Sequence, residues 1–162
     1  MRVVTKGKRK IAIVVAVVAL ASVAAGCLPD NNGAIGPTDP LKNSVFVKLN
    51  ETRQQNGRAP FGYSPKLELD AQIWACVMAG GTGLHHQDLN ALLNRPDHSA
   101  FWTLGENILV GPWYMTDWII VGLFMNSQPH RDNILNANFN VVGIGTCSSN
   151  GQLWVSVVFG GL

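Results

Sequence analysis

The chain has 162 residues, of which 47% are hydrophobic and 14% charged, and its formal net charge is +2. This length fits one globular domain. Five of the twelve basic residues lie within the first ten positions, so the chain after residue 27 has seven basic and ten acidic residues. Nucleic-acid binding requires clustered basic residues on the folded domain, and this composition sets that class aside.

The first 27 residues have the parts of a secretory signal. The basic stretch Met1–Lys10 precedes an apolar run from Ile11 to Ala25, which ends in small residues. The fifteen residues of this run are fewer than the roughly 20 that a membrane-spanning helix needs. We therefore predict an exported protein with a signal at residues 1–27, and an uncleaved anchor is the less favoured alternative.

The letters AAGC, which end at Cys27, resemble a bacterial lipobox. Ala24 stands where leucine is usual, so ordinary cleavage after Ala25 or Gly26 remains an alternative. Lipidation of Cys27 is favoured, and it predicts a lipoprotein on the cell envelope. One acyl chain holds a protein to a membrane only marginally, so a lasting anchor needs the several chains of a lipoprotein.

Residues 28–39 are rich in Gly, Pro, Asn and Asp, which predicts a flexible tether before a domain at residues 40–162. The first predicted helix starts at Pro40, after a cap at Asp39 or Thr38, and stops at Gly57. Its apolar residues recur every four positions, at Leu41, Val45 and Leu49.

A second predicted helix is capped by Ser64, begins at Pro65 and ends before two glycines, and a third covers about residues 116–126. Each carries an apolar stripe with the period of a helix, which predicts that the stripe lies in the core. The stripes are Leu67, Ala71, Trp74, Ala75 and Met78 in the second helix, and Trp118, Val121, Gly122 and Met125 in the third.

The end of the chain predicts a β-hairpin. The segments FNVVGIGTC and QLWVSVVFG are joined by SSNG, and Asn-Gly supplies the positive φ angles of a tight turn. Gly143 and Gly145 share one face of the first strand, so another element is expected to pack closely there. Helices first and strands last, without βαβ alternation, predict an α+β fold.

Cys76 on the second helix and Cys147 in the hairpin form one pair once Cys27 is set apart. An oxidising compartment favours a disulfide between them. Closing a loop of about 70 residues stabilises a fold by about 4 kcal/mol in the chain-entropy model. Two buried free thiols are the alternative, because free cysteine packs like a small apolar residue.

Three segments carry polar residues that no periodicity explains: GTGLHHQDL, LGENILVG and FMNSQPHRDNILN. Taken singly, they fit a solvated loop, an acid at a helix start and a helix capped by Ser127. Taken together, two imidazoles and a carboxylate are groups that bind metals or exchange protons. Serine hydrolases and kinases are excluded, since G-x-S-x-G, a Gly-rich loop, a strand lysine and DFG are all missing.

These segments, with LNETRQQNG, FNVVGIG and LWVSVVFG, follow the order and spacing of the CAP superfamily. The chain resembles this family of cysteine-rich secretory, antigen 5 and pathogenesis-related proteins, and its bacterial SCP-domain branch, over about residues 40–162. The resemblance implies a three-layer α-β-α sandwich with a small, mainly antiparallel sheet. It also implies a cleft lined by His86, Glu106 and His130, with Ser127 where eukaryotic members have a second glutamate.

Two other positions depart from the family pattern. Phe124 stands where bacterial relatives usually have tryptophan, and Ser156 stands where glutamine is common in the last strand. We interpret both residues as packing variants. His85 lies outside the family motif, so we expect His86 to face the cleft.

The favoured function is a module that binds a lipid, a small molecule or an envelope or host component. Its cleft would hold a Zn-like divalent ion through His86 and His130, and Glu106 would either complete the set of ligands or orient a water or a histidine. A metal-assisted hydrolase with Glu106 as general base is the first alternative, and Ser127 in place of a carboxylate counts against it. A purely structural envelope domain is the second. A cysteine hydrolase using Cys76 is disfavoured because Cys147 can pair with it.

Overall fold

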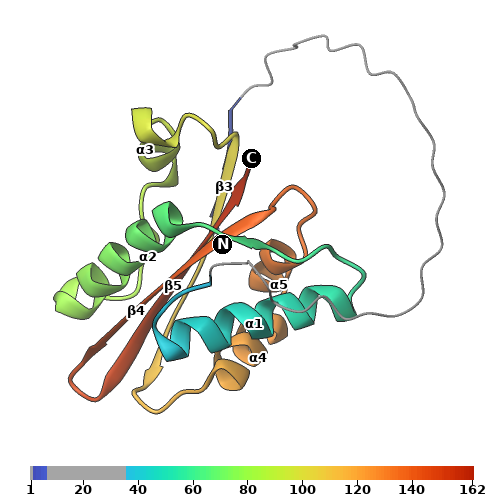
Figure 1. Ribbon diagram of the computed structural model, residues 1–162. Coiled ribbons are helices and arrows are strands. Elements are labelled where there is room, and N and C mark those ends of the chain that lie inside the picture. The colour runs from blue at the N-terminus through green and yellow to red at the C-terminus, as the bar shows by residue number, and fades with distance from the viewer. Residues whose placement is uncertain (1, 7–35) are drawn as a thin grey trace, which may run out of the picture.

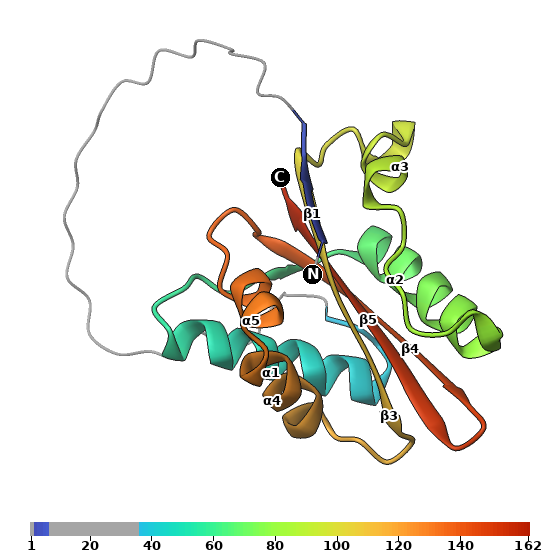
Figure 2. The same ribbon diagram turned by 180° about the vertical axis from the view of Figure 1, so that it is seen from behind.

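The structure is a computed structural model, and it describes residues 2–6 and 36–162. Within these residues, a five-stranded sheet lies between two layers of helices (Figures 1 and 2). Helices α1, α4 and α5 cover one face of the sheet, and α2 and α3 cover the other. The three-layer α-β-α sandwich and the α+β class predicted from the sequence are confirmed.

The elements have the following bounds in chain order. They are β1 (Arg2–Thr5), α1 (Pro40–Gln55), β2 (Gly62–Tyr63), α2 (Pro65–Val77), the π-helical turn η1 (Met78–Thr82), α3 (Leu89–Leu93), the 3₁₀ turn η2 (Pro96–His98), β3 (Thr103–Pro112), α4 (Asp117–Asn126), α5 (Gln128–Ile134), β4 (Val141–Ser149) and β5 (Gln152–Gly161). The three long strands β3, β5 and β4 form the centre of the sheet.

The strand order is β1-β3-β5-β4-β2, and only the short β2–β4 pair is parallel. Each face of the sheet has its own apolar core. The larger core, between the sheet and α1, α4 and α5, includes Val45, Leu49, Ile120, Phe124, Ile134, Phe139, Val157 and Phe159. The smaller core, between the sheet and α2 and α3, includes Leu67, Ala71, Leu89, Leu92, Leu104 and Val158.

The predicted helix starts are confirmed by their caps. The Asp39 side chain accepts a hydrogen bond from Lys42 N at 2.9 Å, and Pro40 is the first residue of α1. Ser64 Oγ accepts from Leu67 N at 3.3 Å at the start of α2. These side-chain oxygens satisfy backbone donors that a helix leaves unpaired in its first turn.

The prediction that the tryptophans on the helical stripes belong to the core is wrong. Trp118 is 71% exposed, and Trp74 is half-buried and donates its ring N–H to His85 O at 2.8 Å. Helix α4 instead buries the face formed by Ile120, Val121 and Phe124. The residues of α4 are apolar all round, so periodicity alone cannot select the face that meets the sheet.

Strand β3 was not predicted, and it corrects the interpretation of LGENILVG. Glu106 lies inside this ten-residue strand and not at the boundary of an element. Both faces of β3 are buried over most of its length, so its sequence lacks the alternation of apolar and polar residues that a half-exposed strand shows. The prediction that strands come only after the helices is also wrong, because β3 precedes α4 and α5 in the chain.

The short strand β1 lies within the predicted signal and pairs with the outer edge of β3, with Arg2 opposite Glu106. Most of the predicted signal, Cys27 and most of the tether lie outside the described residues. Cleavage of the signal would remove β1 and leave that edge of β3 unpaired. Among residues 2–6 and 36–162, no helix has the length and apolar character needed to cross a membrane.

The predicted hairpin is confirmed. Asn150 and Gly151 have φ angles of 51° and 73° at the turn between β4 and β5. The close approach expected at Gly143 and Gly145 is also confirmed, because the backbone of α2 lies against both. A Cβ atom at either glycine would lie 2.1 Å from backbone atoms of α2.

A buried histidine that the sequence did not single out joins α2 to η2. His98 is fully buried, with Nε2 2.7 Å from an Asp70 carboxylate oxygen and Nδ1 3.1 Å from an Asp97 oxygen. The hydrogen bond from His98 helps to hold the pKa of the Asp97 carboxyl well below its ordinary value. This cluster is a structural link, since both ring nitrogens are already engaged.

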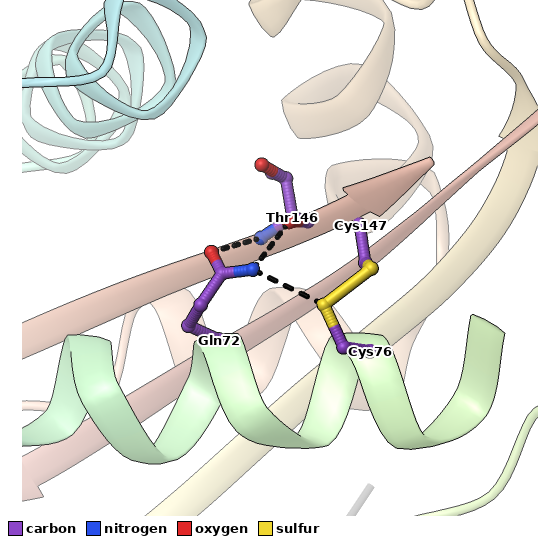
Figure 3. Close-up of a disulfide and its surroundings, with 4 residues drawn as sticks. All are labelled: Gln72, Cys76, Thr146 and Cys147. Atoms are coloured by element: carbon purple, nitrogen blue, oxygen red, sulfur yellow. Dashed lines mark hydrogen bonds between the residues drawn. A yellow bond between two sulfur atoms is a disulfide. The ribbon is translucent and has the colours of Figure 1, made fainter. Parts of the chain in front are cut away.

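Cys76 and Cys147 form a disulfide between α2 and β4, as predicted (Figure 3). Beside it, Gln72 Nε2 donates to Thr146 O at 2.7 Å and Gln72 Oε1 accepts from Thr146 N at 3.3 Å. Strand β2 pairs with β4 only at Val141 and Val142, so the Gln72 amide satisfies backbone groups further along that edge. The disulfide and this amide hold α2 to β4 at the same place.

Mass spectrometry of the folded protein under non-reducing conditions should find the peptides of Cys76 and Cys147 joined. Reduction should separate them with a gain of two hydrogen atoms. Two free thiols in protein isolated from an oxidising compartment would contradict the bridge.

Candidate functional site

Glu106 is the centre of the candidate site. It lies in the middle of β3, its side chain is fully buried, and it points to the side of the sheet that α2 and α3 cover. His86, in the segment between η1 and α3, places Nδ1 2.8 Å from Glu106 Oε2. The His86 side chain remains 23% exposed, so part of it is accessible to solvent.

Three further donors complete the environment of the Glu106 carboxylate. Gln87 donates from its backbone N to Oε2 at 3.3 Å and from Nε2 to Oε1 at 2.8 Å. The Ser156 hydroxyl on β5 donates to Oε1 at 2.9 Å. Together with His86, these donors give each carboxylate oxygen two hydrogen bonds. The four bonds offset the free-energy cost of burying a polar group between apolar layers.

His130 lies in the first turn of α5 and is half-buried. Its ring contacts the ring of Phe124 edge-on, with centroids 5.3 Å apart. Burial lowers the pKa of His130 below its ordinary value of 6.5, and repulsion by nearby basic groups adds to the shift. The imidazole of His130 is therefore neutral at physiological pH.

Side chains of α5 and β3 tie this helix to β3 and α4. Asn107 Nδ2 donates to His130 O at 2.9 Å, and Asn133 Nδ2 donates to Glu106 O at 3.1 Å and to Asn107 Oδ1 at 2.9 Å. Arg131 donates to Met125 O at the end of α4. These bonds hold α5, and with it His130, against the part of β3 that carries Glu106.

The sequence of this chain matches the model of the family described as CAP, the cysteine-rich secretory protein family, over residues 47–159. The chain belongs to the CAP family. It is 41% identical over 123 residues to YkwD, an uncharacterised protein of Bacillus subtilis; the match covers 74% of this chain and 47% of YkwD. The chain therefore spans about half the length of that relative.

Solved structures share the CAP fold. An outer surface protein of Borrelia burgdorferi has a TM-score of 0.66 at 17% identity, over 78% of this chain and 98% of that one. An extracellular SCP-domain protein of Bacillus anthracis has a TM-score of 0.64 at 20% identity, over 79% of this chain and 45% of that one. At these identities the likeness concerns the fold alone.

The structure of this CAP domain places His86, and not His85, against Glu106. The ring of His85 is exposed instead, with Nδ1 2.9 Å from Gly83 O, and it packs edge-on against Trp74. Ser127 occupies the N-cap position of α5, but its side chain makes no capping hydrogen bond. The expectation that Ser127 caps this helix through its side chain is therefore wrong.

Sequence reasoning missed two residues of this cluster. Ser156 was interpreted as a packing variant, whereas its buried hydroxyl donates to Glu106. Gln87 lies in the segment HHQDL and was assigned no role from the sequence, but it makes two of the four hydrogen bonds to the carboxylate. Ser156 could have been recognised from its place in the apolar run LWVSVVFG, because a buried hydroxyl needs a hydrogen-bond partner.

The metal-ligating groups of the described part of the CAP domain do not form a set of three. Within residues 2–6 and 36–162, no group of three His, Cys, Asp or Glu side chains is placed to hold an ion. A separate hollow of about 280 Å³ lies between α1 and α4 and contains none of the four cleft residues. Its lining is Lys48, Thr52, Trp118, Val121, Gly122, Met125 and Asn126.

Proposed function

We propose that this chain is an exported CAP-domain protein whose cleft binds a divalent cation through His86 and His130, together with a small molecule or an envelope component. The observation that carries the proposal is the bond between His86 Nδ1 and the buried carboxylate of Glu106. A carboxylate only accepts, so Nδ1 carries the hydrogen, and the lone pair of a neutral His86 ring lies on Nε2. Carboxylates commonly orient metal-binding histidines in this way.

The state of His130 supports the same function. Burial lowers its pKa, so its imidazole stays neutral and able to bind a metal to a pH below 6.5. Two imidazoles fit a Zn-like ion, and solvent or a bound ligand would supply the remaining positions. Of the two roles expected for Glu106, orienting His86 is the one that its hydrogen bonds favour.

A hydrolase gains no support from this geometry. A general base must reach a water molecule, and Glu106 is fully buried with both oxygens engaged by His86, Gln87 and Ser156. Ser127 supplies no second carboxylate. A purely structural domain would need no oriented, partly exposed imidazole at this place.

Calorimetric titration with Zn²⁺ at neutral pH should show one site in the wild-type protein. The double change His86→Ala/His130→Ala should abolish that site, while Glu106→Gln should weaken it by roughly 10- to 100-fold, as loss of an orienting partner does. Binding should also weaken on acidification, at a pH below 6.5 for His130 because its pKa is lowered, since protonated imidazole cannot bind a metal.

His85→Ala is the matched control, since it removes a neighbouring imidazole that faces away from Glu106. It should bind zinc like the wild type. Undiminished binding by the double His86/His130 variant, or equal loss with His85→Ala, would overturn the proposed site. Circular dichroism of each variant checks that the fold is kept.

Export and anchoring rest on the signal at residues 1–27. One structural relative is an extracellular SCP-domain protein of Bacillus anthracis and another is a cysteine-rich secretory protein of Staphylococcus aureus, with a TM-score of 0.58. Both descriptions support an extracellular location for this chain. Lipidation at Cys27 would make it a membrane-anchored lipoprotein.

Cell fractionation tests the anchor. Cys27→Ser should move the protein from the membrane fraction to the medium or block its maturation, because the modified side chain is removed. Ala24→Leu brings the segment closer to a lipobox and should leave the protein in the membrane fraction. Cys27→Ser protein that fractionates like the wild type would mean that the signal is cleaved without lipidation or is retained.

A further inference from the structure

Helix α4 exposes a face that has almost no polar residue. Of its ten residues, DWIIVGLFMN, eight in succession are apolar. The helix buries Ile120, Val121 and Phe124 against the core. Trp118, Ile119 and Leu123 on its other side are 71%, 37% and 51% exposed. A helix on the outside of a domain normally presents charged and polar residues to water, and α4 does not.

The segment that precedes α4 also exposes aromatic side chains. Trp113 and Tyr114 are 65% and 64% exposed, and their rings pack edge-on with centroids 5.8 Å apart. We name the five residues the aromatic face: Trp113, Tyr114, Trp118, Ile119 and Leu123. Asp117 is the only charged residue between positions 113 and 126. Five exposed apolar side chains within the eleven residues from 113 to 123 indicate a contact surface.

The residue types fit a lipid bilayer as the partner. Tryptophan and tyrosine concentrate at the boundary between water and lipid, where an apolar ring and a polar N–H or O–H are both satisfied. Helices that lie in this boundary insert tryptophan and aliphatic side chains a short way into the lipid. The aromatic face offers two indoles, one phenol and two aliphatic side chains.

The position of the face relative to the predicted anchor agrees with this partner. The start of α1 and the segment between β3 and α4 lie at the same end of the domain in both views (Figures 1 and 2). Gly36 is nine positions after Cys27, and a fully extended chain spans at most about 3.3–3.6 Å per residue. A lipid at Cys27 would therefore keep this end of the domain within roughly 30 Å of the membrane.

We propose that the aromatic face docks on the lipid bilayer to which the chain is anchored, with Trp113 and Trp118 at the level of the upper acyl chains. This proposal rests on the proposed export and anchoring. Docking would restrict the reach of the tether and fix which side of the domain faces away from the membrane. The anchor supplies lasting attachment, and the aromatic face supplies orientation.

Quenching of tryptophan emission by brominated lipid tests the proposal on the full chain. The protein is reconstituted into vesicles of phosphatidylcholine with bromine on the upper acyl carbons and compared with vesicles of unbrominated phosphatidylcholine. All five tryptophans lie at or after position 74, so the predicted signal contributes no emission. Brominated lipid should lower wild-type emission, and Trp113→Ser/Trp118→Ser should lose most of that effect.

Leu69→Ser/Ile73→Ser is the matched control, because these side chains are 60% and 54% exposed on α2, on the opposite face of the sheet. It should be quenched like the wild type. Flotation separates the anchor from the face: protein that floats with the vesicles but is not quenched overturns docking alone. Quenching that survives in Trp113→Ser/Trp118→Ser also overturns it.

Protein that does not float at all overturns both the anchor and the docking. A second copy of this chain is the competing occupant of the aromatic face. In that case analytical ultracentrifugation would show a dimer that Trp113→Ser/Trp118→Ser converts to a monomer, without quenching by brominated lipid, and the membrane proposal would be overturned. A wild-type monomer that is quenched supports it.

Discussion

Gly145→Ala should separate α2 from β4 and lower the free energy of unfolding by roughly 5 kcal/mol or more. The added Cβ would lie 2.1 Å from the carbonyl carbon of Ala71 and 2.2 Å from Gln72 N. These are backbone atoms of a helix that the disulfide of Cys76 also fixes, so no side chain can rotate away to make room. Chemical denaturation of the purified variant measures the loss.

Gly143→Ala should be as harmful, because its Cβ would meet Glu68 N at 2.1 Å. The two glycines are two residues apart on β4 and meet α2 about one turn apart, so the helix axis follows the strand. Gly122→Ala is the matched control. It lies within α4, where the added Cβ would meet no atom within 4 Å beyond its chain neighbours and the backbone of its own helix, and it should stabilise the protein by about 0.4–1 kcal/mol. Equal stability of Gly145→Ala and the wild type would contradict the close packing.

The starts of α1 and α2 could be predicted because the residues that determine them are neighbours in the sequence. Asp39 and Ser64 each precede a proline at the first helical position, and both side chains accept the expected backbone hydrogen bond. The hairpin was equally local, since Asn150 and Gly151 adopt the positive φ angles that the turn demands. Signals of this kind depend on a few neighbouring residues and survive any tertiary arrangement.

The course of β3 and the orientation of α4 could not be predicted, because both depend on what surrounds them. β3 is covered on both faces, which removes the alternation that identifies a half-exposed strand. α4 is apolar on all sides, so the choice between burying Trp118 and burying Phe124 is made by packing against α1 and the sheet. Sequence periodicity assigned Trp118 to the core, where the structure places Phe124.

The candidate site divides in the same way. His86, Glu106 and His130 were identifiable because their motifs are compact and resemble those of a family. The residues that complete the environment of Glu106 come from elsewhere: Gln87 lacked a recognisable role, and Ser156 lies 50 positions away on β5. Hydrogen-bond partners brought together only by the sheet register leave little trace in a single sequence.

Nothing in the sequence around Arg53 indicated its structural role. A basic residue in the last turn of a helix is ordinarily a solvated partner of the helix dipole. Arg53 is instead only 2% exposed. Its guanidinium donates to four backbone carbonyls: Ala59 O at 2.6 Å, Ile134 O at 2.6 Å, Asn136 O at 3.1 Å and Phe139 O at 3.2 Å. Burial lowers its pKa to about 10, so it remains a cation at neutral pH.

Arg53→Met should lower the free energy of unfolding by roughly 5 kcal/mol, because four hydrogen bonds to a charged donor are lost and the buried carbonyls are left without it. Arg53→Lys should fall between methionine and the wild type, since one ammonium cannot replace a planar guanidinium with donors on several sides. Arg58→Met is the matched control: it removes an exposed arginine five residues away and should change stability by less than about 0.5 kcal/mol.

The loss at Arg53 should also reach the cleft. Ile134 and Asn136 lie at the end of α5, and His130 lies in the first turn of the same seven-residue helix. Without the cation at its carboxyl end, α5 loses its link to α1, and zinc affinity should decline in Arg53→Met protein that still folds. Urea denaturation and zinc titration of the same preparations measure both effects. Wild-type values for both would show that α5 is held by Asn133 and the core alone.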